Sequence, residues 1–503
     1  MKPGRTVLLF LMSLLMMNQW LLGGGMKHAP NKNTSSKLLT DTTTDFNVNN
    51  IRMTMRNSGQ LIDAANGPGF EWPKNSFTQV IFTGGLWIGG KVNGALRIAA
   101  VQYDTSGFQP GTMKGGIAAN RNNPAFRFYE IERTDTAGTP NYNSWPDSQG
   151  APTVDGTPLR KGDQNIWCVY NDSRIAGREF RTPPLKVEVR QYVYGDTTTD
   201  DLNNTVYAEF KIINRDTLYS IDSAFISLWL DIDIGSNGGN TDDVSGVDTS
   251  LSLAYCYNGD TFDTEYGSTP PAVGVLVLRA PGGIPESSPH SFISYNPFDQ
   301  YAGDSTEAYN YLKGLTREGN VIVDQATSLP TRFMYSGDPV ANTGWVDTTA
   351  EDKVILFSYG PFSIASGDST DFHTAIIVAR GTDRLNSVTL LKQAVPVVQA
   401  HYNSKLVSVP GAGQLPAKFS LIQNYPNPFN PVTNFQFTIS KLQFVSLKVY
   451  DVLGREVATL ASQEFHPGKY HAAWDASNMP SGVYFYRLVS GQSSSVKKMI
   501  LMR

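Results

Sequence analysis

The chain has 503 residues, of which 40% are hydrophobic and 17% charged, so it carries enough apolar material for two or three packed domains. The formal net charge is −4 and Lys and Arg form no cluster, which argues against binding to nucleic acid or to an anionic membrane surface. The 45 glycines, 29 prolines and 11% aromatic residues favour short strands and turns, and predict a mainly β protein.

The N-terminus has the features of a secretory signal peptide. Lys2 and Arg5 precede an apolar run from Thr6 to Met17, and small residues follow at positions 23–25. This run is shorter than the roughly 20 residues that a helix needs to cross a bilayer, so we expect residues 1–25 to be cleaved. No transmembrane segment is predicted in the remaining chain. Residues 26–50, rich in Ser and Thr, are predicted to form a flexible leader.

Residues 51–404 are predicted to form a β-sandwich body of one or two subdomains. Two apolar runs are joined by Asn93-Gly94, a dipeptide typical of tight hairpin turns. The glycines of GGLWIGG lack the spacing and the Lys-Ser/Thr of a phosphate loop, so we expect them to allow close backbone packing. Further strands are predicted at residues 185–194, 206–213, 224–230, 273–278, 354–358 and 373–379.

Two cysteines, Cys168 and Cys256, both lie in strand-like sequence of the body. An oxidising compartment permits one disulfide between them, and two buried free thiols are the alternative, because the sequence does not fix the separation of their Cα atoms. Neither cysteine has a recognisable catalytic signature.

An acidic segment of the body, LDIDIGSNGGNTDDVSGVD, carries five carboxylates, at Asp231, Asp233, Asp242, Asp243 and Asp248. These groups repel one another unless they are solvated, protonated or neutralised by a cation, and oxygen ligands on a glycine-rich loop suit Ca²⁺. The spacing matches an EF-hand loop only in part, because Gly235 and Ser236 do not fit and no flanking helices are predicted. The segment is therefore a candidate structural calcium site, with a solvated acidic turn as the alternative.

Two helices are predicted within the body, both as packing elements. The first starts at Asp304, which forms a capping box with Glu307, and ends at Gly319. The second starts at Ser387 and contains Pro396, which we expect to kink it. Its apolar stripe consists of Leu391, Ala394, Val398 and Tyr402.

No motif in the body assigns an enzymatic activity. The HExxH and GxSxG patterns are absent, whereas a triad or a glycosidase pair assembled from distant positions stays open. Aromatic faces can stack on sugar rings, and Trp72 and Trp145, each next to a proline, are the predicted ligand-binding residues. We expect a non-catalytic structural, adhesive or glycan-binding module, with an extracellular hydrolase acting on polysaccharide or protein as the alternative.

After a linker at residues 405–415, residues 416–503 predict a second, smaller β domain. Its first two strands show period-2 alternation, with apolar residues at Phe435, Phe437, Ile439, Val445, Leu447 and Val449. Five or six such strands with glycine turns predict a small immunoglobulin-like sandwich of about ninety residues. The preceding NYPNPFNP is predicted to be a stiff, proline-rich lead-in that Tyr425 and Phe429 hold against the sandwich.

The C-terminal motifs carry a specific resemblance. NYPNPFNP, YDVLGREV, WDASNMPSGVYFYRL and KKMILMR, in this order, resemble the type A C-terminal sorting domain of substrates of the type IX secretion system of Gram-negative bacteria. The sorting motif consists of Asn424, Tyr425, Pro426, Asn427, Pro428, Phe429, Asn430 and Pro431. The resemblance departs from the family at WDAS, where WDG is commoner, which is a variation in a turn.

The resemblance implies a route and a set of partners. The signal peptide would direct passage through the inner membrane into the periplasm, and the sorting domain would guide translocation across the outer membrane by the type IX machinery. In such substrates a sortase usually removes the domain, and the mature part is released or attached to surface polysaccharide. The body segments GGLWIGGKVNG, GDQNIWCVYND and SLWLDIDIG resemble an uncharacterised family of extracellular proteins that carry the same domain, which implies a shared fold.

Overall fold

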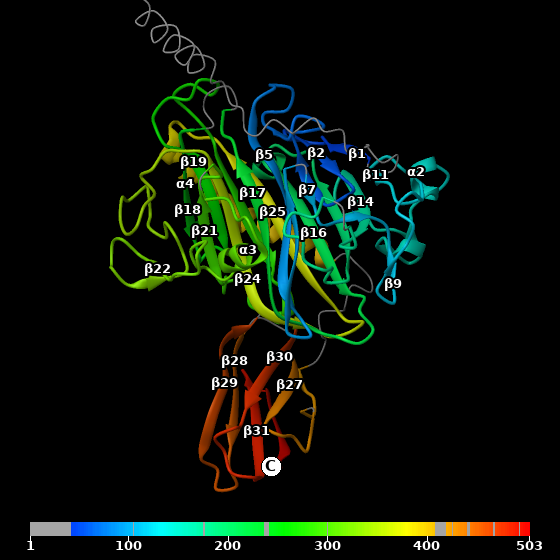
Figure 1. Cartoon of the computed structure of the whole chain (residues 1–503), viewed down its shortest axis with the longest axis vertical. Helices are drawn as coiled ribbons and strands as arrows, with labels where there is room; N and C mark the ends of the chain where they lie inside the picture. The colour runs from blue at the N-terminus through cyan, green and yellow to red at the C-terminus, as the bar shows by residue number, and fades with distance from the viewer. Residues whose placement is uncertain are drawn as a thin grey trace, which may run out of the picture. The chain divides into compact units, whose positions relative to one another are not determined.

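The computed structural model describes residues 42–502 apart from positions 104, 175–176, 236–240, 299, 408–418, 425, 440–442, 466–467 and 492. The predicted signal peptide and most of the predicted leader and linker lie outside the described residues. The chain divides into two compact units, a body that ends at Tyr402 and a C-terminal unit from Asn403 to Arg503. Both units are built from antiparallel strands, which confirms the mainly β prediction (Figure 1).

Two large antiparallel sheets make up the body. The first sheet runs in the order β1 (Thr43–Phe46), β2 (Arg52–Arg56), β4 (Phe70–Glu71), β5 (Gln79–Val92), β17 (Ile221–Ile232), β24 (Lys353–Ile364) and β21 (Ser291–Tyr295). Three further strands belong to this sheet. The strands β3 (Gln60–Asp63) and β6 (Ala95–Gln102) both pair with β5, and β7 (Thr105–Ser106) pairs with β6. The second sheet runs in the order β11 (Tyr129–Glu132), β14 (Gln164–Asn171), β15 (Val187–Gly195), β16 (Thr205–Asn214), β25 (Ser369–Ala379), β20 (Ala272–Arg279), β19 (Leu253–Asn258) and β18 (Asp243–Asp248), with β8 (Gln109–Pro110) beside β14.

Shorter strands, helices and turns lie outside the two sheets. The short strands are β9 (Met113–Lys114), β10 (Ile117–Ala118), β12 (Thr153–Val154), β13 (Thr157–Pro158), β22 (Ile322–Val323) and β23 (Pro330–Thr331). The helices are α2 (Pro140–Asn143), α3 (Ser305–Leu312) and α4 (Arg384–Val407), and single 3-10 turns lie at η1 (Asp147–Gln149), η2 (Asp201–Asn204) and η3 (Pro281–Gly283). Within the described residues, no helix is both long and apolar enough to cross a membrane.

The strand β17 shows how the sequence builds the layers. Leu228 and Leu230 belong to the main core between the sheets, whereas Trp229 belongs to a second apolar cluster on the other face of the first sheet. This alternation follows from the period of 2 of a strand, which sends successive side chains to opposite faces. The strand is buried on both faces because α3 and its neighbouring segments cover the Trp229 side.

The predicted hairpin at Asn93-Gly94 joins β5 to β6, and both turn residues have positive φ, 50° and 78°. Positive φ at both central residues is the requirement of a type I′ hairpin turn, which confirms the prediction. The predicted flexible leader is wrong at its C-terminal end. Thr43–Phe46 forms β1, which pairs with β2, and Phe46 is fully buried.

The helix α3 begins as predicted, with Asp304 accepting hydrogen bonds from the backbone N–H groups of Thr306 and Glu307. It ends at Leu312, earlier than the predicted Gly319, because Gly314 takes the left-handed conformation with φ 76°. The helix α4 begins at Arg384, three residues before the predicted start, and continues through Pro396 to Val407, into the predicted linker.

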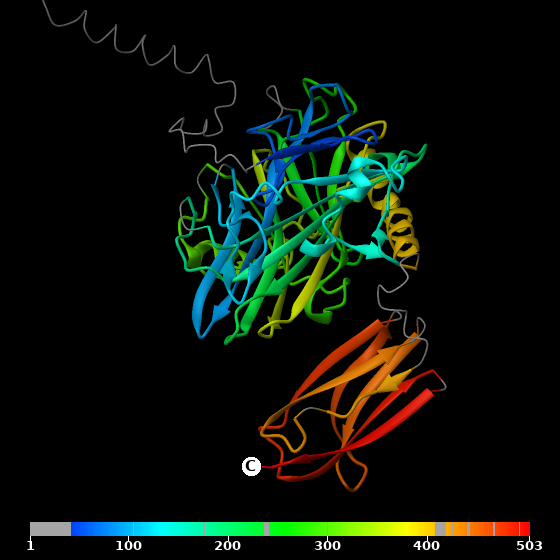
Figure 2. The same cartoon turned by 90° about the vertical axis from the view of Figure 1, so that its right-hand side faces the viewer.

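The helix α4 packs on the outer face of the second sheet, as Figure 2 shows for the gold helix beside the strands. Leu391 is fully buried, and it lies so close to Gly274 of β20 that a Cβ at Gly274 would come within 3.1 Å of it. Tyr402 donates or accepts a hydrogen bond of 2.6 Å with Nδ1 of His373 on β25. The predicted apolar stripe is therefore the buried face of the helix.

His373 lies under α4 in a polar but closed environment. Its ring contacts the Tyr402 hydroxyl and lies 3.8 Å from Glu209, whose carboxylate is held by Lys161 at 2.6 Å. Burial lowers the pKa of His373 well below its usual value, and the positive charges of Arg279, Lys161 and Lys211 lower it further. Lys161 pairs with Glu209, and the lowered pKa of His373 favours its neutral form.

The C-terminal unit is a small sandwich of two sheets. One sheet contains β26 (Ser420–Leu421), β27 (Val432–Ile439) and β30 (Gly468–Asp475). The other contains β29 (Glu456–Phe465), β28 (Gln443–Tyr450), β31 (Gly482–Ser490) and β32 (Ser493–Leu501). The alternating apolar residues predicted on β27 and β28 all lie in its core.

The packing of α4 gives a first prediction. Leu391→Ala should destabilise the body by about 2 to 5 kcal/mol, because it leaves a cavity over Gly274. Leu390→Ala, at a neighbouring position that is 36% exposed, should change the free energy of unfolding by less than about 0.5 kcal/mol. Urea unfolding of both variants measures the difference, and equal losses would contradict the packing described for α4.

The environment of His373 gives a second prediction, on pH. The unfolded side chain titrates near about 6.5, whereas the folded side chain has a lowered pKa. Stability is therefore full above about pH 6.5 and falls as the pH drops toward the folded pKa, because only the unfolded state takes up the proton. Between pH 7.5 and 5.5 the free energy of unfolding should fall more for the wild type than for His373→Gln. Equal falls would show that His373 titrates normally in the folded state.

Candidate metal centre

Three carboxylates converge at one end of the first sheet. Asp231 is the penultimate residue of β17, Asp233 follows that strand, and Asp352 immediately precedes β24. One oxygen of each carboxylate lies within 4.8 Å of the others. All three residues are buried, with exposed fractions of 0%, 3% and 1%. This group of Asp231, Asp233 and Asp352 is called the acidic cluster below.

Strand register brings the cluster together. Asp231 lies opposite Val354 in the pairing of β17 with β24, so the same register continued by two residues places Asp233 opposite Asp352. The period of 2 puts all these side chains on the face of the first sheet that carries Trp229. The carboxylates on this face act on Tyr103. Burial raises the pKa of its phenol, and the negative charges of Asp231 and Asp352 raise it further.

Asp243, the first residue of β18 in the second sheet, adds a fourth carboxylate beside the cluster. It is fully buried, and its Oδ2 accepts a hydrogen bond of 3.2 Å from the backbone N–H of Ile234. Its Oδ1 has no hydrogen-bond partner among the described residues. Burial raises the pKa of Asp243 well above its usual value, and Asp233 and Asp352 are among the groups that raise it further. The two sheets meet here, because the backbone oxygen of Asp243 accepts the N–H of Glu351.

The other two predicted ligands, Asp242 and Asp248, are not members of the acidic cluster. Asp242 is next to Asp243, and burial raises its pKa to about 6, with Asp260 and Asp263 adding to the shift. Asp248 is wrong as a ligand, because it lies at the opposite end of β18 and forms an ion pair of 3.3 Å with Lys392. The intervening positions 236–240 lie outside the described residues.

Asp352 is the member of the cluster that the sequence did not predict. It lies far along the chain from the acidic segment, and its neighbourhood has no ligand motif. Only the pairing of β17 with β24 relates the two segments. The available signal was an acidic residue two positions before the strand predicted at 354–358, and it becomes informative once the partner of that strand is known.

The possible disulfide is wrong. Cys168 and Cys256 are both free and fully buried. They lie on β14 and β19 of the second sheet, which are separated by β15, β16, β25 and β20. At about 4.8 Å per strand spacing, that order holds the two thiols far beyond bonding distance.

Trp72 and Trp145 are also wrong as exposed sugar-binding platforms. Their exposed fractions are 5% and 7%. The indole N–H of Trp72 donates to Asn204 and that of Trp145 donates to the Pro152 carbonyl, so both rings are fixed within the body. The proline beside each tryptophan marks a turn whose aromatic ring folds inward.

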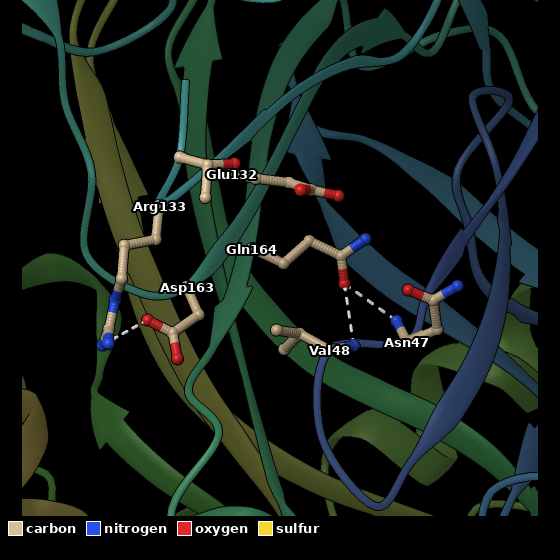
Figure 3. A pocket seen from close by; sticks show the side chains of 7 residues that line it. Asn47, Val48, Glu132, Arg133, Asp163 and Gln164 are labelled. Carbon is tan, nitrogen blue, oxygen red and sulfur yellow. Dashed lines mark hydrogen bonds and ion pairs between the residues drawn. The ribbon is translucent and has the colours of Figure 1, made fainter. Parts of the chain in front are cut away.

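A hollow of about 240 Å³ opens on the body away from these features, and Figure 3 shows its lining. Its lining residues are Asn47, Val48, Glu132, Arg133, Thr134, Asp163 and Gln164. The Gln164 side chain accepts the backbone N–H groups of Asn47 and Val48, and Arg133 pairs with Asp163. Two carboxylates, those of Glu132 and Asp163, therefore face a solvent-accessible space.

The proline-rich sorting motif is bound to the last strand of the C-terminal unit. Phe429 is buried, packs on Trp474, and pairs with Leu501 of β32 through a parallel bridge. The Asn427 side chain accepts the N–H of Ile500 at 2.9 Å. The side chain of Asn424 donates to the carbonyl of Pro426 within the motif and to the hydroxyl of Thr433 on β27.

The predicted anchoring role of Phe429 is thus correct, whereas Tyr425 lies outside the described residues. Pro426, Pro428 and Asn430 are exposed, and Pro431 is half-buried. Their exposure agrees with a segment whose prolines offer no N–H for pairing and whose turn residues face solvent.

Comparison with solved structures finds distant likenesses. They include a polysaccharide lyase, with 8% identity, a TM-score of 0.20, and coverage of 83% of this chain and 46% of that one. A dimeric latent PorU from Porphyromonas gingivalis has 12% identity, a TM-score of 0.14, and coverage of 67% and 31%. PorZ of the same organism, a surface component of the type IX secretion system, has 10% identity, a TM-score of 0.15, and coverage of 67% and 43%.

The chain spans less than half the length of each of these proteins, and TM-scores this low carry no argument about the body. Among curated proteins, none matches the sequence. Residues 423–502, however, match the family of secretion system C-terminal sorting domains. The C-terminal unit is such a sorting domain, and the protein is secreted by the type IX system to the cell surface or the extracellular space.

Proposed function

We propose that the body is a non-catalytic, adhesive or glycan-binding module that the sorting domain delivers to the outside of the cell. Three exposed phenylalanines on the loops around the acidic cluster support this role. Phe77, Phe262 and Phe298 are 84%, 63% and 65% exposed. An aromatic face that remains in solvent is available to stack on a sugar ring or to pack on a protein partner.

The backbone of each phenylalanine is held in place by a nearby polar side chain. The N–H of Phe77 donates to Glu71, that of Phe262 to Asp260, and that of Phe298 to Asn296. Fixed backbones present the rings with little entropy left to lose on binding, which favours recognition.

The three loops lie around the same end of the body. Gly235, two residues after Asp233, donates its N–H to the carbonyl of Gln79, next to the Phe77 loop. A Cβ at Gly235 would lie 2.1 Å from the carboxylate of Asp263, the neighbour of Phe262.

The third loop joins this end through Asn296. Its side chain donates to Glu351, whose own N–H donates to Asp243 beside the cluster. Loops at one end of a rigid sandwich are common binding surfaces. The proposed partner is a surface polysaccharide or another cell-surface glycan.

This role predicts the effect of removing the rings. The triple variant Phe77→Ala, Phe262→Ala, Phe298→Ala should lose more than about tenfold in affinity for glycans that the wild type retains on an array, since stacked rings contribute about 0.5 to 1.5 kcal/mol each. Its thermal unfolding should change little, because the rings are exposed.

Leu218→Ala is the matched control. Leu218 is 77% exposed and lies just before the start of β17, at the end of that strand away from the acidic cluster. The glycan binding of this variant should equal that of the wild type. Retained binding by the triple variant, or equal loss by the control, would reject this loop end as the contact surface.

A second candidate is a hydrolase, and the hollow of Figure 3 is the observation in its favour. Glu132 and Asp163 are two carboxylates beside one solvent-accessible space, as acid and base catalysis of glycoside cleavage requires. Against it, Arg133 already pairs with Asp163.

The two candidates differ in a direct assay. We expect the full chain to release no reducing ends or peptides from bacterial and host polysaccharides or proteins. If cleavage occurs and is lost in Glu132→Gln or Asp163→Asn, while Asp155→Asn at an exposed hairpin tip retains it, the hydrolase replaces the binding module.

A further inference from the structure

We propose that Asp231, Asp233 and Asp352, with Asp243, bind a calcium ion where the two sheets of the body meet. This site does not depend on the binding role proposed above. Three carboxylate oxygens within 4.8 Å of one another form one side of a ligand shell. Asp243, on β18 of the second sheet, is not one of these three, but it lies beside Asp233 through its bond to the Ile234 N–H and would add a ligand from that sheet.

Burial makes a cation at this position favourable. Taking a carboxylate out of water is costly unless the group is protonated, paired or coordinated to a metal, and neighbouring carboxylates increase the cost. Here the three members of the cluster are at most 3% exposed and share one face of a sheet. A divalent ion would offset their mutual repulsion.

Asp243 is a separate observation that points to the same ligand. Its Oδ2 is occupied by the Ile234 N–H, next to Asp233, while its Oδ1 is fully buried and has no hydrogen-bond partner among the described residues. A buried polar oxygen without a hydrogen-bond partner is rare in folded proteins and calls for a specific cause. A bound cation supplies that cause.

Lys353, which follows Asp352 in the chain, is a buried cation that forms its ion pairs with other carboxylates. It is 1% exposed, and its Nζ lies 3.1 Å from Asp347 and 2.8 Å from Glu351. Its charge is therefore shared between two other carboxylates. The side chain of Lys353 points to the opposite face of β24 from Asp352, as adjacent strand residues do.

The donor set selects the metal. The group contains carboxylate oxygens and neither His nor Cys, which disfavours zinc and copper. Calcium accepts six to eight oxygen ligands in a flexible geometry, whereas magnesium requires a near-ideal octahedron and retains several waters. A shell assembled from β17, β24 and β18 fits the larger, more tolerant ion.

The first test uses the full chain, stripped with a chelator and dialysed. Isothermal titration should show one calcium ion bound per chain. At a hundredfold excess of calcium over its dissociation constant, the unfolding temperature of the body should rise by about 3 °C. Absence of binding would overturn the proposal, and an equal or larger shift with the same concentration of magnesium would overturn the choice of metal.

Variants assign the binding to these residues. Asp352→Asn and Asp243→Asn should each weaken calcium binding by more than about tenfold, since even outer partners of a metal site carry about ten- to a hundredfold. In chelator, both variants should unfold at a higher temperature than the wild type, because each removes a repelling charge. A purely structural aspartate would give the opposite result.

Two matched controls complete the test. Asp222→Asn changes an exposed residue at the opposite end of β17, and Asp248→Asn changes the acidic residue at the opposite end of β18. Both should retain the calcium shift of the wild type. If Asp352→Asn and Asp243→Asn also retain it, calcium binds elsewhere and the assignment fails.

Discussion

The body depends on how the first sheet is joined to the second at the end of β17. The chain leaves the centre of the first sheet at Ile232 and enters the edge of the second at Asp243, whose carbonyl accepts the N–H of Glu351, two residues before β24 of the first sheet. Four buried carboxylates lie at this crossing, those of Asp231, Asp233, Asp243 and Asp352. A cation bound there, as proposed, would link β17 and β24 of the first sheet to β18 of the second.

Features determined by local sequence could be predicted. Asn93-Gly94 favours positive φ, so the hairpin followed from two residues. The stripe that contains Leu391 identified the buried face of α4, and alternation placed β27 and β28. The C-terminal domain combined alternation with ordered motifs, and its assignment as a secretion sorting domain is confirmed. The helix ends were less accurate, because one left-handed glycine, Gly314, stops α3 early.

Features determined by the pairing of distant strands could not be predicted. Asp352 joins the acidic cluster only through the register of β17 with β24, and Asp248 is excluded only because β18 is extended. The exposure of a side chain also depends on residues that are distant in the sequence. Trp72 lies beside a proline, as surface residues often do, but Tyr266 from a distant loop packs on it. The distance between the two cysteines follows only from the strand order of the whole second sheet.

Anomalous X-ray diffraction from crystals grown with calcium tests the central claim most directly, because it locates the ion without reference to stability. The account predicts one strong peak at about 2.3 to 2.6 Å from carboxylate oxygens of Asp231, Asp233 and Asp352. The peak should also lie beside Oδ1 of Asp243. A map that lacks a peak there, or that shows a lysine ammonium or protonated, hydrogen-bonded carboxyl pairs at the crossing, would contradict the account.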